Sequence, residues 1–170
     1  MKTSNQQEQE FTNMIESHKK LIFKIANAYC KNVEDKKDLT QEIILQLWRA
    51  FPNYNPQFAI TTWMYRIALN VSISYYRQTS KRKIKTVSND NYILQIADNT
   101  EIQTPQNEQL QLLQQFINEL KELDKAIMLL YLENNKYEEI ADILGISKTN
   151  VATKISRIKQ QLKKRFNDLV

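Results

Sequence analysis

The sequence predicts an all-α protein with two small helical domains joined by a flexible linker, the C-terminal domain being a helix-turn-helix. The 170 residues include only 1 Gly and 3 Pro, which favours long helices and few tight turns. Alternation with a period of two residues, typical of strands, is scarce, whereas apolar residues recur at three- and four-residue spacing. With 42% hydrophobic residues, the chain can bury a core.

Three helices are expected in the N-terminal half. Apolar periodicity predicts the first over Gln7 to Lys31 and the second over Lys36 to Phe51, the latter N-capped by Asp35. The third is expected over Phe58 to Gln78, with Ile73 on its polar face. The predicted buried stripes are Phe11, Met14, Ile15, His18, Leu21, Ile22, Ile25 and Tyr29; Leu39, Ile43, Leu47 and Phe51; and Ile60, Trp63, Met64, Ile67, Ala68 and Val71.

Residues 86–108 are expected to form a linker between domains at 1–85 and 109–170. They are rich in Asn, Gln, Asp and Thr, show no sustained period and carry a net negative charge, whereas both flanking segments are net positive. The segment Tyr92–Ile96 is too apolar for a free tether, so we expect it to dock elsewhere on the protein.

The segment from Tyr137 to Phe166 predicts two helices joined at Gly145, the arrangement of a helix-turn-helix. A glycine at a helix end suits the left-handed conformation, which a Cβ disfavours. Ala141 is small enough to let the helices approach, and Ser147 can cap the second helix. An ordinary helical hairpin would give the same pattern. The expected buried contacts are Ile140, Leu144, Ile146, Val151, Ile155, Ile158 and Leu162.

Charge favours DNA as the partner of this hairpin, although a basic, solvated helix face is the alternative. Between Ile143 and Asn167 there are seven Lys or Arg and no Asp or Glu. Polar side chains early in the second helix can reach base edges in the major groove, and later basic side chains suit phosphates. The candidates for base contacts are Thr149, Asn150, Thr153, Lys154 and Arg157; those for phosphates are Lys159, Lys163, Lys164 and Arg165.

A second basic and aromatic group lies in the N-terminal half. Aromatic faces beside a cationic track are typical of a surface that binds single-stranded nucleic acid, because unstacked bases need an aromatic partner. The alternative is that residues such as Trp63 simply belong to the core. The group comprises Tyr54, Phe58, Trp63, Tyr65, Tyr75 and Tyr76 with Arg66, Arg77, Lys81 and Arg82.

Other classes of function are disfavoured. The single Cys30 excludes an internal disulfide, and no apolar run reaches the roughly 18 residues that span a membrane. His18, the only histidine, is expected to be a packed or surface residue rather than a metal ligand. No catalytic triad, metal cluster or phosphate loop is evident, so we expect a cytoplasmic, non-enzymatic protein without a cofactor.

Two segments resemble a known family. Residues 38–70, DLTQEIILQLWRAFPNYNPQFAITTWMYRIALN, resemble the second conserved region of bacterial RNA polymerase sigma factors, and residues 137–162 resemble their fourth region. The order and the intervening linker resemble the extracytoplasmic-function (ECF) group. Extended, the 23 linker residues span roughly 75 Å, and two duplex turns measure about 70 Å, so both domains can reach promoter elements two turns apart.

The resemblance implies an alternative sigma factor that binds core RNA polymerase and promoter DNA, as duplex and as melted strand, and that is held by an anti-sigma factor without inserting into the membrane. It assigns polymerase binding to Asp38, Gln41, Glu42, Leu45 and Gln46. It assigns the minus-ten element to Asn53, Tyr54, Asn55, Phe58, Trp63, Arg66, Asn70 and Arg77. It assigns the minus-thirty-five element to Thr149, Asn150, Thr153, Lys154 and Arg157.

The departures from the family pattern concern promoter sequence more than function. The family usually has Asp where Ser74 stands, a basic residue at Ala152 and Ser at Thr153, and the aromatic pair of housekeeping members is here Trp63-Met64. The rival functions are a free-standing helix-turn-helix regulator and an adaptor that holds polymerase but not DNA. Under the sigma-factor hypothesis, Gly145→Val should damage upstream-element binding, through a Cβ clash and β-branching, and spare polymerase binding.

Overall fold

The computed structural model describes residues 3–86 and 105–168, and in these ranges it contains helices and no strand. The predicted all-α fold is therefore confirmed. The Tyr92–Ile96 segment and most of the expected linker lie outside the described residues. The elements are α1 (Ser4–Tyr29), α2 (Val33–Ala50), the short 3-10 helix η1 (Phe51–Asn53), α3 (Ile60–Thr86), α4 (Pro105–Glu119), α5 (Glu122–Leu132), α6 (Tyr137–Leu144) and α7 (Lys148–Asn167).

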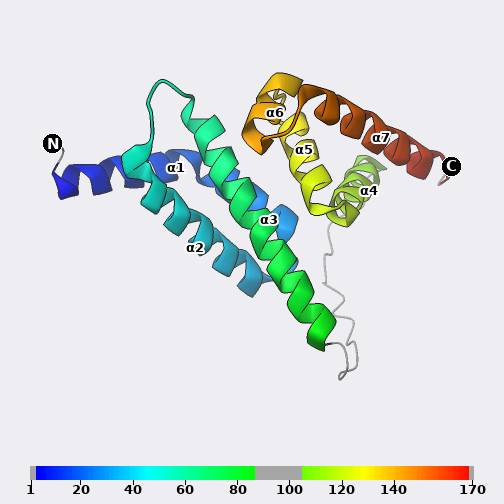
Figure 1. Cartoon of the computed structure of the whole chain (residues 1–170). Helices are drawn as coiled ribbons and strands as arrows, with labels where there is room; N and C mark the ends of the chain where they lie inside the picture. The colour runs from blue at the N-terminus through cyan, green and yellow to red at the C-terminus, as the bar shows by residue number, and fades with distance from the viewer. Residues whose placement is uncertain (1–2, 87–104, 169–170) are drawn as a thin grey trace.

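Helices α1, α2 and α3 pack together as the N-terminal half (Figure 1). The second predicted stripe forms the centre of this packing, because Leu39, Ile43 and Leu47 are fully buried. Met64 and Ala68 of α3 are fully buried as well. Apolar residues at three- and four-residue spacing share one face of a helix, so each helix buries that face against the other two.

The helix starts differ from the predicted ones. The predicted cap of α2, Asp35, is wrong: the Asn32 side chain accepts a hydrogen bond from the Asp35 backbone N–H at 2.8 Å, and Asp35 lies in the first turn. Asparagine is as good a cap as aspartate, and the chain reaches it three residues earlier.

Helix α1 has a non-helical residue at His18, whose Nδ1 lies 3.0 Å from the Met14 carbonyl oxygen.

Helices α4 to α7 form the C-terminal half, and α4 starts at Pro105, within the segment 86–108 that was expected to be a linker. Most positions predicted to be buried in the helix pair are so: Ile140, Val151, Ile155 and Ile158 are at most 2% exposed, and Leu144, Ile146 and Leu162 are partly buried. A smaller cluster joins α4, α5 and α7 through Phe116, Leu120, Met128 and Ile158.

The two halves pack against each other. Helices α5 and α6 lie beside α3 in Figure 1, and the larger buried cluster is continuous from α1, α2 and α3 to α5, α6 and α7. Ile73, expected on the polar face of α3, is 9% exposed and belongs to this cluster. That expectation was wrong because α3 buries a second face, which one helix pattern could not reveal.

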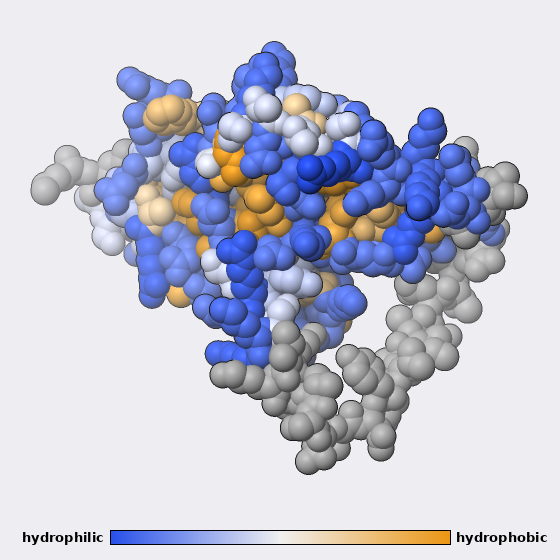
Figure 2. Space-filling model, turned by 45° about the vertical axis from the view of Figure 1, so that its right-hand side comes forward, coloured by the Kyte–Doolittle hydropathy of each residue, from blue (hydrophilic) through white to orange (hydrophobic). Residues whose placement is uncertain are grey.

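The face of the molecule seen in Figure 2 is mainly hydrophilic. Figure 2 shows polar side chains over most of one face, with apolar side chains gathered in a central band. Across residues 3–86 and 105–168, no helix combines the length and the apolar character needed to span a bilayer.

Candidate nucleic-acid interface

The turn between α6 and α7 has the conformation that the sequence predicts. Gly145 ends α6 with φ 68° and ψ 35°, and the backbone N–H of Ile146 donates to the Ala141 carbonyl oxygen at 3.1 Å. Ser147 caps α7, since its Oγ accepts a hydrogen bond from the Asn150 N–H at 3.1 Å. Apart from Gly145 itself and its two chain neighbours, no residue has an atom within 4 Å of a Cβ built on Gly145. The expected Cβ clash is therefore one with the local backbone, imposed by the positive φ, and not one with residues packed around the turn.

The outer face of α7 presents the predicted base-reading side chains to solvent. Thr149, Asn150, Thr153 and Arg157 are exposed, whereas the buried stripe of α7 faces α5 and α6. The Thr153 hydroxyl donates to the Thr149 carbonyl oxygen at 2.9 Å, which orients its methyl and oxygen on the surface. A polar, basic face on the second helix of a helix-turn-helix is suited to the major groove.

Lys154 is placed differently from its predicted partners on α7. Its Nζ forms an ion pair with Asp124 Oδ1 at 2.8 Å, and its side chain is 27% exposed. Packing of α7 on α5 brings Asp124 to this position, which the spacing within α7 could not indicate. Lys154 therefore ties the two helices together in the structure, instead of standing free beside Thr153 and Arg157.

The exposed face of α2 collects the five residues predicted to contact polymerase. Asp38, Gln41 and Leu45 are exposed, and Glu42 and Gln46 are half-buried and hydrogen-bonded to each other at 2.8 Å. The buried residues of α2 lie on its other side. The five predicted residues thus share one accessible helical face.

Trp48 extends this face and was missed by the sequence reasoning. It is 36% exposed, and its ring meets the Phe11 ring edge-on at a centroid distance of 5.0 Å. The available signal was its position three residues after Leu45, which places both side chains on one side of α2. A groove of about 620 Å³ lies between α2 and α3. Its lining includes Asp38 and Glu42 of α2 and Asn70 of α3.

The segment before α3 forms a tightly hydrogen-bonded loop. The Tyr54 hydroxyl donates to the Phe58 carbonyl oxygen at 2.6 Å, and the Asn55 side chain accepts from the Gln57 N–H at 3.0 Å. The Tyr54 and Trp63 rings lie 5.0 Å apart, while the Phe58 side chain is 65% exposed. Asn53, at the start of the loop, is also exposed. The loop thus combines a packed ring pair, Tyr54 and Trp63, with the exposed ring of Phe58. An exposed ring of this kind can stack on an unpaired base.

The polar face of α3 is in contact with the C-terminal half. Arg66 Nη2 donates to the Asp142 carbonyl oxygen of α6 at 3.0 Å, and Arg77 Nε pairs with Glu122 Oε1 of α5 at 2.8 Å. The hydrogen bond from Arg77 holds the pKa of Glu122 below its ordinary value. Asn70 is exposed between these two arginines. The predicted minus-ten residues of α3 thus lie together on one face. Both arginines among them, Arg66 and Arg77, are bound to groups of the C-terminal half.

Two family models match the chain. Sigma-70 region 2 matches residues 14–82, and Sigma-70 region 4 matches residues 110–162. The first match contains the α2 face, the loop and the polar face of α3 up to its Arg82, and the second contains α5, α6 and the base-reading part of α7.

Curated relatives and solved structures agree with these matches. The chain is 29% identical over 135 residues to the RNA polymerase sigma factor YlaC of Bacillus subtilis, covering 78% of each chain. It is 28% identical over 149 residues to the ECF RNA polymerase sigma-E factor of Haemophilus influenzae, covering 80% of this chain and 77% of that protein. Its fold is similar to that of RpoE from Bartonella quintana, solved with the anti-sigma factor NepR, with a TM-score of 0.72, 17% identity and coverage of 93% and 97%.

Proposed function

The chain belongs to the sigma-70 family of RNA polymerase sigma factors and is of the extracytoplasmic-function type, and from this premise we propose how its surfaces share the work of transcription initiation. It is an alternative sigma factor that directs promoter-specific initiation. The observation that carries the proposal is the presence of both family regions in one chain, each with an accessible polar face of its own.

The exposed face of α2 binds core RNA polymerase. Asp38, Gln41 and Glu42 supply polar contacts, and Leu45 supplies an exposed apolar one. A face with an apolar centre and polar surroundings is typical of a protein–protein interface. Because the α2 core lies behind this face, its residues can be changed without opening the packing of the N-terminal half.

Residues 1–85 form the domain that recognises and melts the minus-ten element. The loop from Asn53 to Phe58 takes up a base removed from the stack, with Phe58 as the stacking partner and Asn55 as a polar contact. Removing a base from the stack costs a few kcal/mol, so the loop must offset that cost. Its hydrogen bonds and the Tyr54–Trp63 contact support this role, because a fixed loop loses little entropy on binding. Arg66, Asn70 and Arg77 then follow the strand along α3.

Residues 109–170 form the domain that reads the minus-thirty-five element as duplex, and residues 86–108 link the two domains. Helix α7 enters the major groove with its exposed N-terminal half, where Thr149, Asn150, Thr153 and Arg157 contact bases. Lys154 joins them once DNA competes with its Asp124 partner. The later basic residues of α7 contact phosphates.

The proposed partners are core RNA polymerase, promoter DNA and an anti-sigma factor. Two of the solved structures with a similar fold, RpoE with NepR and CnrH with the cytosolic domain of CnrY, are complexes, which supports the third partner. The protein contributes binding and positioning, and no chemical step of its own, to a reaction carried out by the polymerase. It acts where the polymerase acts, in the cytoplasm.

The test is run-off transcription with purified core polymerase on a library of promoter templates. We expect discrete, promoter-dependent RNA starts that are absent without the protein, and sequencing them gives both promoter elements. Absence of any promoter-dependent start would contradict the proposal. Tight, sequence-specific duplex binding without polymerase would instead favour a free-standing helix-turn-helix regulator.

A further inference from the structure

We propose that a cavity bordered by α1, α3, α4 and α5 is a binding site for a small organic phosphate of the nucleotide class. Lysine side chains of the lining bind the phosphate, and amide side chains bind the base. The cavity has a volume of about 600 Å³, within the roughly 300–1,000 Å³ of small-molecule sites. None of the residues proposed to bind polymerase or DNA is among the described residues that line it, so the site goes beyond the proposed function.

A buried cation lines the cavity. Lys125 is only 3% exposed, and its Nζ donates to the Ala28 carbonyl oxygen at 3.0 Å and to the Asn118 carbonyl oxygen at 3.3 Å. Nζ also lies 5.3 Å and 5.5 Å from the centroids of the Tyr29 and Tyr76 rings. An ammonium has three N–H donors, and hydrogen bonds to described residues use two of them. The remaining donor can bind a ligand in the cavity.

Two further lysines, Lys31 and Lys36, line the same cavity. Burial lowers the pKa of Lys125, and the positive charge of Lys31 lowers it further. The charges of Cys30 and Glu122 act in the opposite direction without cancelling that shift. Like charges that act on each other at a buried site are relieved by an anion bound to both. A phosphate group has several acceptor oxygens and up to two negative charges, so it can bind both ammonium groups at once.

The carboxylates near these lysines have partners of their own. Glu122 is paired with Arg77 at 2.8 Å. Asp35, a carboxylate of the lining, accepts a hydrogen bond from Asn32 Nδ2 at 2.7 Å. Lys31 forms no ion pair with any residue in the part of the chain that the structure describes. Positive charge at the cavity is therefore left for an anionic ligand.

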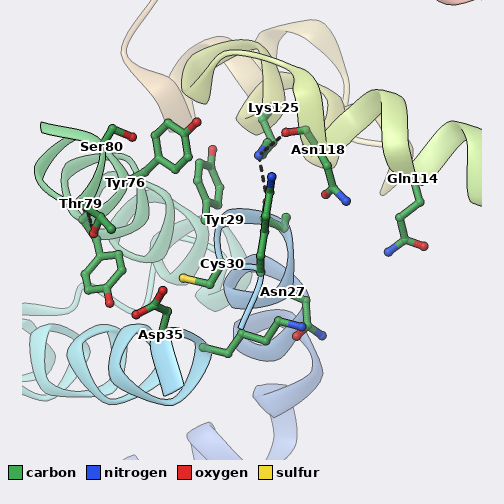
Figure 3. Close-up of a pocket in the computed structure, with 14 residues that line it drawn as sticks. Asn27, Tyr29, Cys30, Asp35, Tyr76, Thr79, Ser80, Gln114, Asn118 and Lys125 are labelled. Atoms are coloured by element: carbon green, nitrogen blue, oxygen red, sulfur yellow. Dashed lines mark hydrogen bonds between the residues drawn. The ribbon is translucent and has the colours of Figure 1, made fainter. Parts of the chain in front are cut away.

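The walls of the cavity supply neutral polar groups. Figure 3 shows Thr79 and Ser80 of α3 on one side and Gln114 and Asn118 of α4 on the other, with Lys125 between the two sides in this view. An amide side chain carries both donors and an acceptor, which match the edge of a nucleotide base. Hydroxyl groups can bind the ribose. The combination favours a nucleotide over inorganic phosphate as the ligand.

The experiment measures binding to the full chain by isothermal titration calorimetry. The probes are AMP, ATP and GTP, with adenosine and inorganic phosphate as probes that carry only one part of a nucleotide. We expect at least one nucleotide to bind once per chain with a Kd of about 10–100 μM. Each partial probe should bind at least about tenfold more weakly, because it meets only the amide groups or only the lysines.

Two variants at exposed positions of the lining test the two parts of the site. Lys31→Gln should weaken nucleotide binding about tenfold or more, because it removes a charge-assisted hydrogen bond. Gln114→Leu should weaken nucleotide binding and leave the binding of inorganic phosphate unchanged. Lys163→Gln, the same change of charge at an exposed lysine of α7, is the matched control and should bind as wild type does. Circular dichroism verifies that each variant keeps its helices.

The position of the ligand is checked by nuclear magnetic resonance. In the ¹⁵N-labelled chain, the side-chain amide signals of Asn27, Gln114 and Asn118 should shift on addition of the nucleotide that binds best. Shifts confined to the amides of α7 would overturn the site, because they would place the ligand on the basic face of α7 instead.

The remaining outcomes are equally decisive. Absence of binding by all three nucleotides, or equal losses for Lys31→Gln and Lys163→Gln, overturns the proposal. Inorganic phosphate that binds as tightly as the nucleotides overturns the assignment of the amide groups and with it the nucleotide class. Promoter-dependent transcription can stand under each of these results, so failure of the site and failure of the proposed function are distinguishable.

Discussion

Two helices of this protein, α3 and α7, carry polar faces suited to DNA, and the two faces differ in how much of them is in contact with neighbouring helices. The base-reading side chains of α7 are exposed, apart from Lys154, which is paired with Asp124 of α5 in the same half. The corresponding face of α3 has both of its assigned arginines bound to α5 and α6. The comparison teaches that exposure of a polar helix face depends on what packs beside it: the α7 face is open to solvent, whereas the two arginines of the α3 face are held by contacts between the halves.

The largest expected effect tests whether the exposed face of α2 binds core polymerase and is separate from the two DNA-binding faces. Asp38→Ala with Gln41→Ala should weaken binding to core polymerase by about 30-fold or more, since central interface residues contribute about 2 kcal/mol or more. Both side chains are exposed and α2 keeps its buried side, so circular dichroism should not change. Anisotropy of labelled protein titrated with core enzyme measures the loss. Gln9→Ala with Glu16→Ala on α1 is the control, and an unchanged affinity of the α2 variant would refute the assignment.

The next effect tests the exposed face of α7. Arg157→Ala should weaken duplex binding by holoenzyme by about 1–3 kcal/mol if the side chain contacts a base, and should leave polymerase binding unaltered. Lys154→Ala should have a smaller effect on DNA, because Lys154 is already paired with Asp124. Band-shift titration of an upstream-element duplex measures both. Equal losses for the two variants would show that the ion pair does not withhold Lys154 from DNA.

A smaller effect concerns the turn that places α7. At Gly145 the positive φ is the only obstacle to a side chain, so Gly145→Val should lower the free energy of unfolding by about 1–2 kcal/mol. Gly145→Asn should lower it less, because asparagine tolerates the left-handed region. Urea unfolding measures the two values. Upstream-element binding should fall in the same order with polymerase binding retained, and equal losses for Val and Asn would contradict a purely backbone origin.

The smallest effect concerns the ion pair between the halves. The folded-state pKa of Glu122 is lowered, chiefly by its hydrogen bond from Arg77, from the ordinary value of 4.5. The contribution of the Glu122–Arg77 pair to the free energy of unfolding is therefore fully present above pH 4.5 and is lost as the pH falls through the lowered pKa of Glu122. As an exposed pair it is expected to contribute at most about 1 kcal/mol. Unfolding curves of wild type and Glu122→Gln should differ at pH 7 and converge near pH 3; a constant difference would contradict this origin.

Local features of the site were predictable from the sequence because they depend on neighbours along the chain. The three- and four-residue spacing of Leu39, Ile43 and Leu47 gave the buried side of α2 and thereby its exposed side. Gly145 and Ser147 gave the turn and the cap of the helix pair. The fate of Lys154 was not predictable, because its partner Asp124 lies on another helix 30 residues away.

By itself, the sequence determined the helical class, the order of the two family regions and the faces that carry their contacts. These follow from periodicity, from turn and cap residues and from charge along one helix. Only the tertiary structure decided that α5 and α6 pack on α3, that Ile73 is buried and that Lys125 sits between Tyr29 and Tyr76. These depend on which surfaces meet between distant segments, and the amphipathic pattern of one helix records only that a face is apolar, not what covers it.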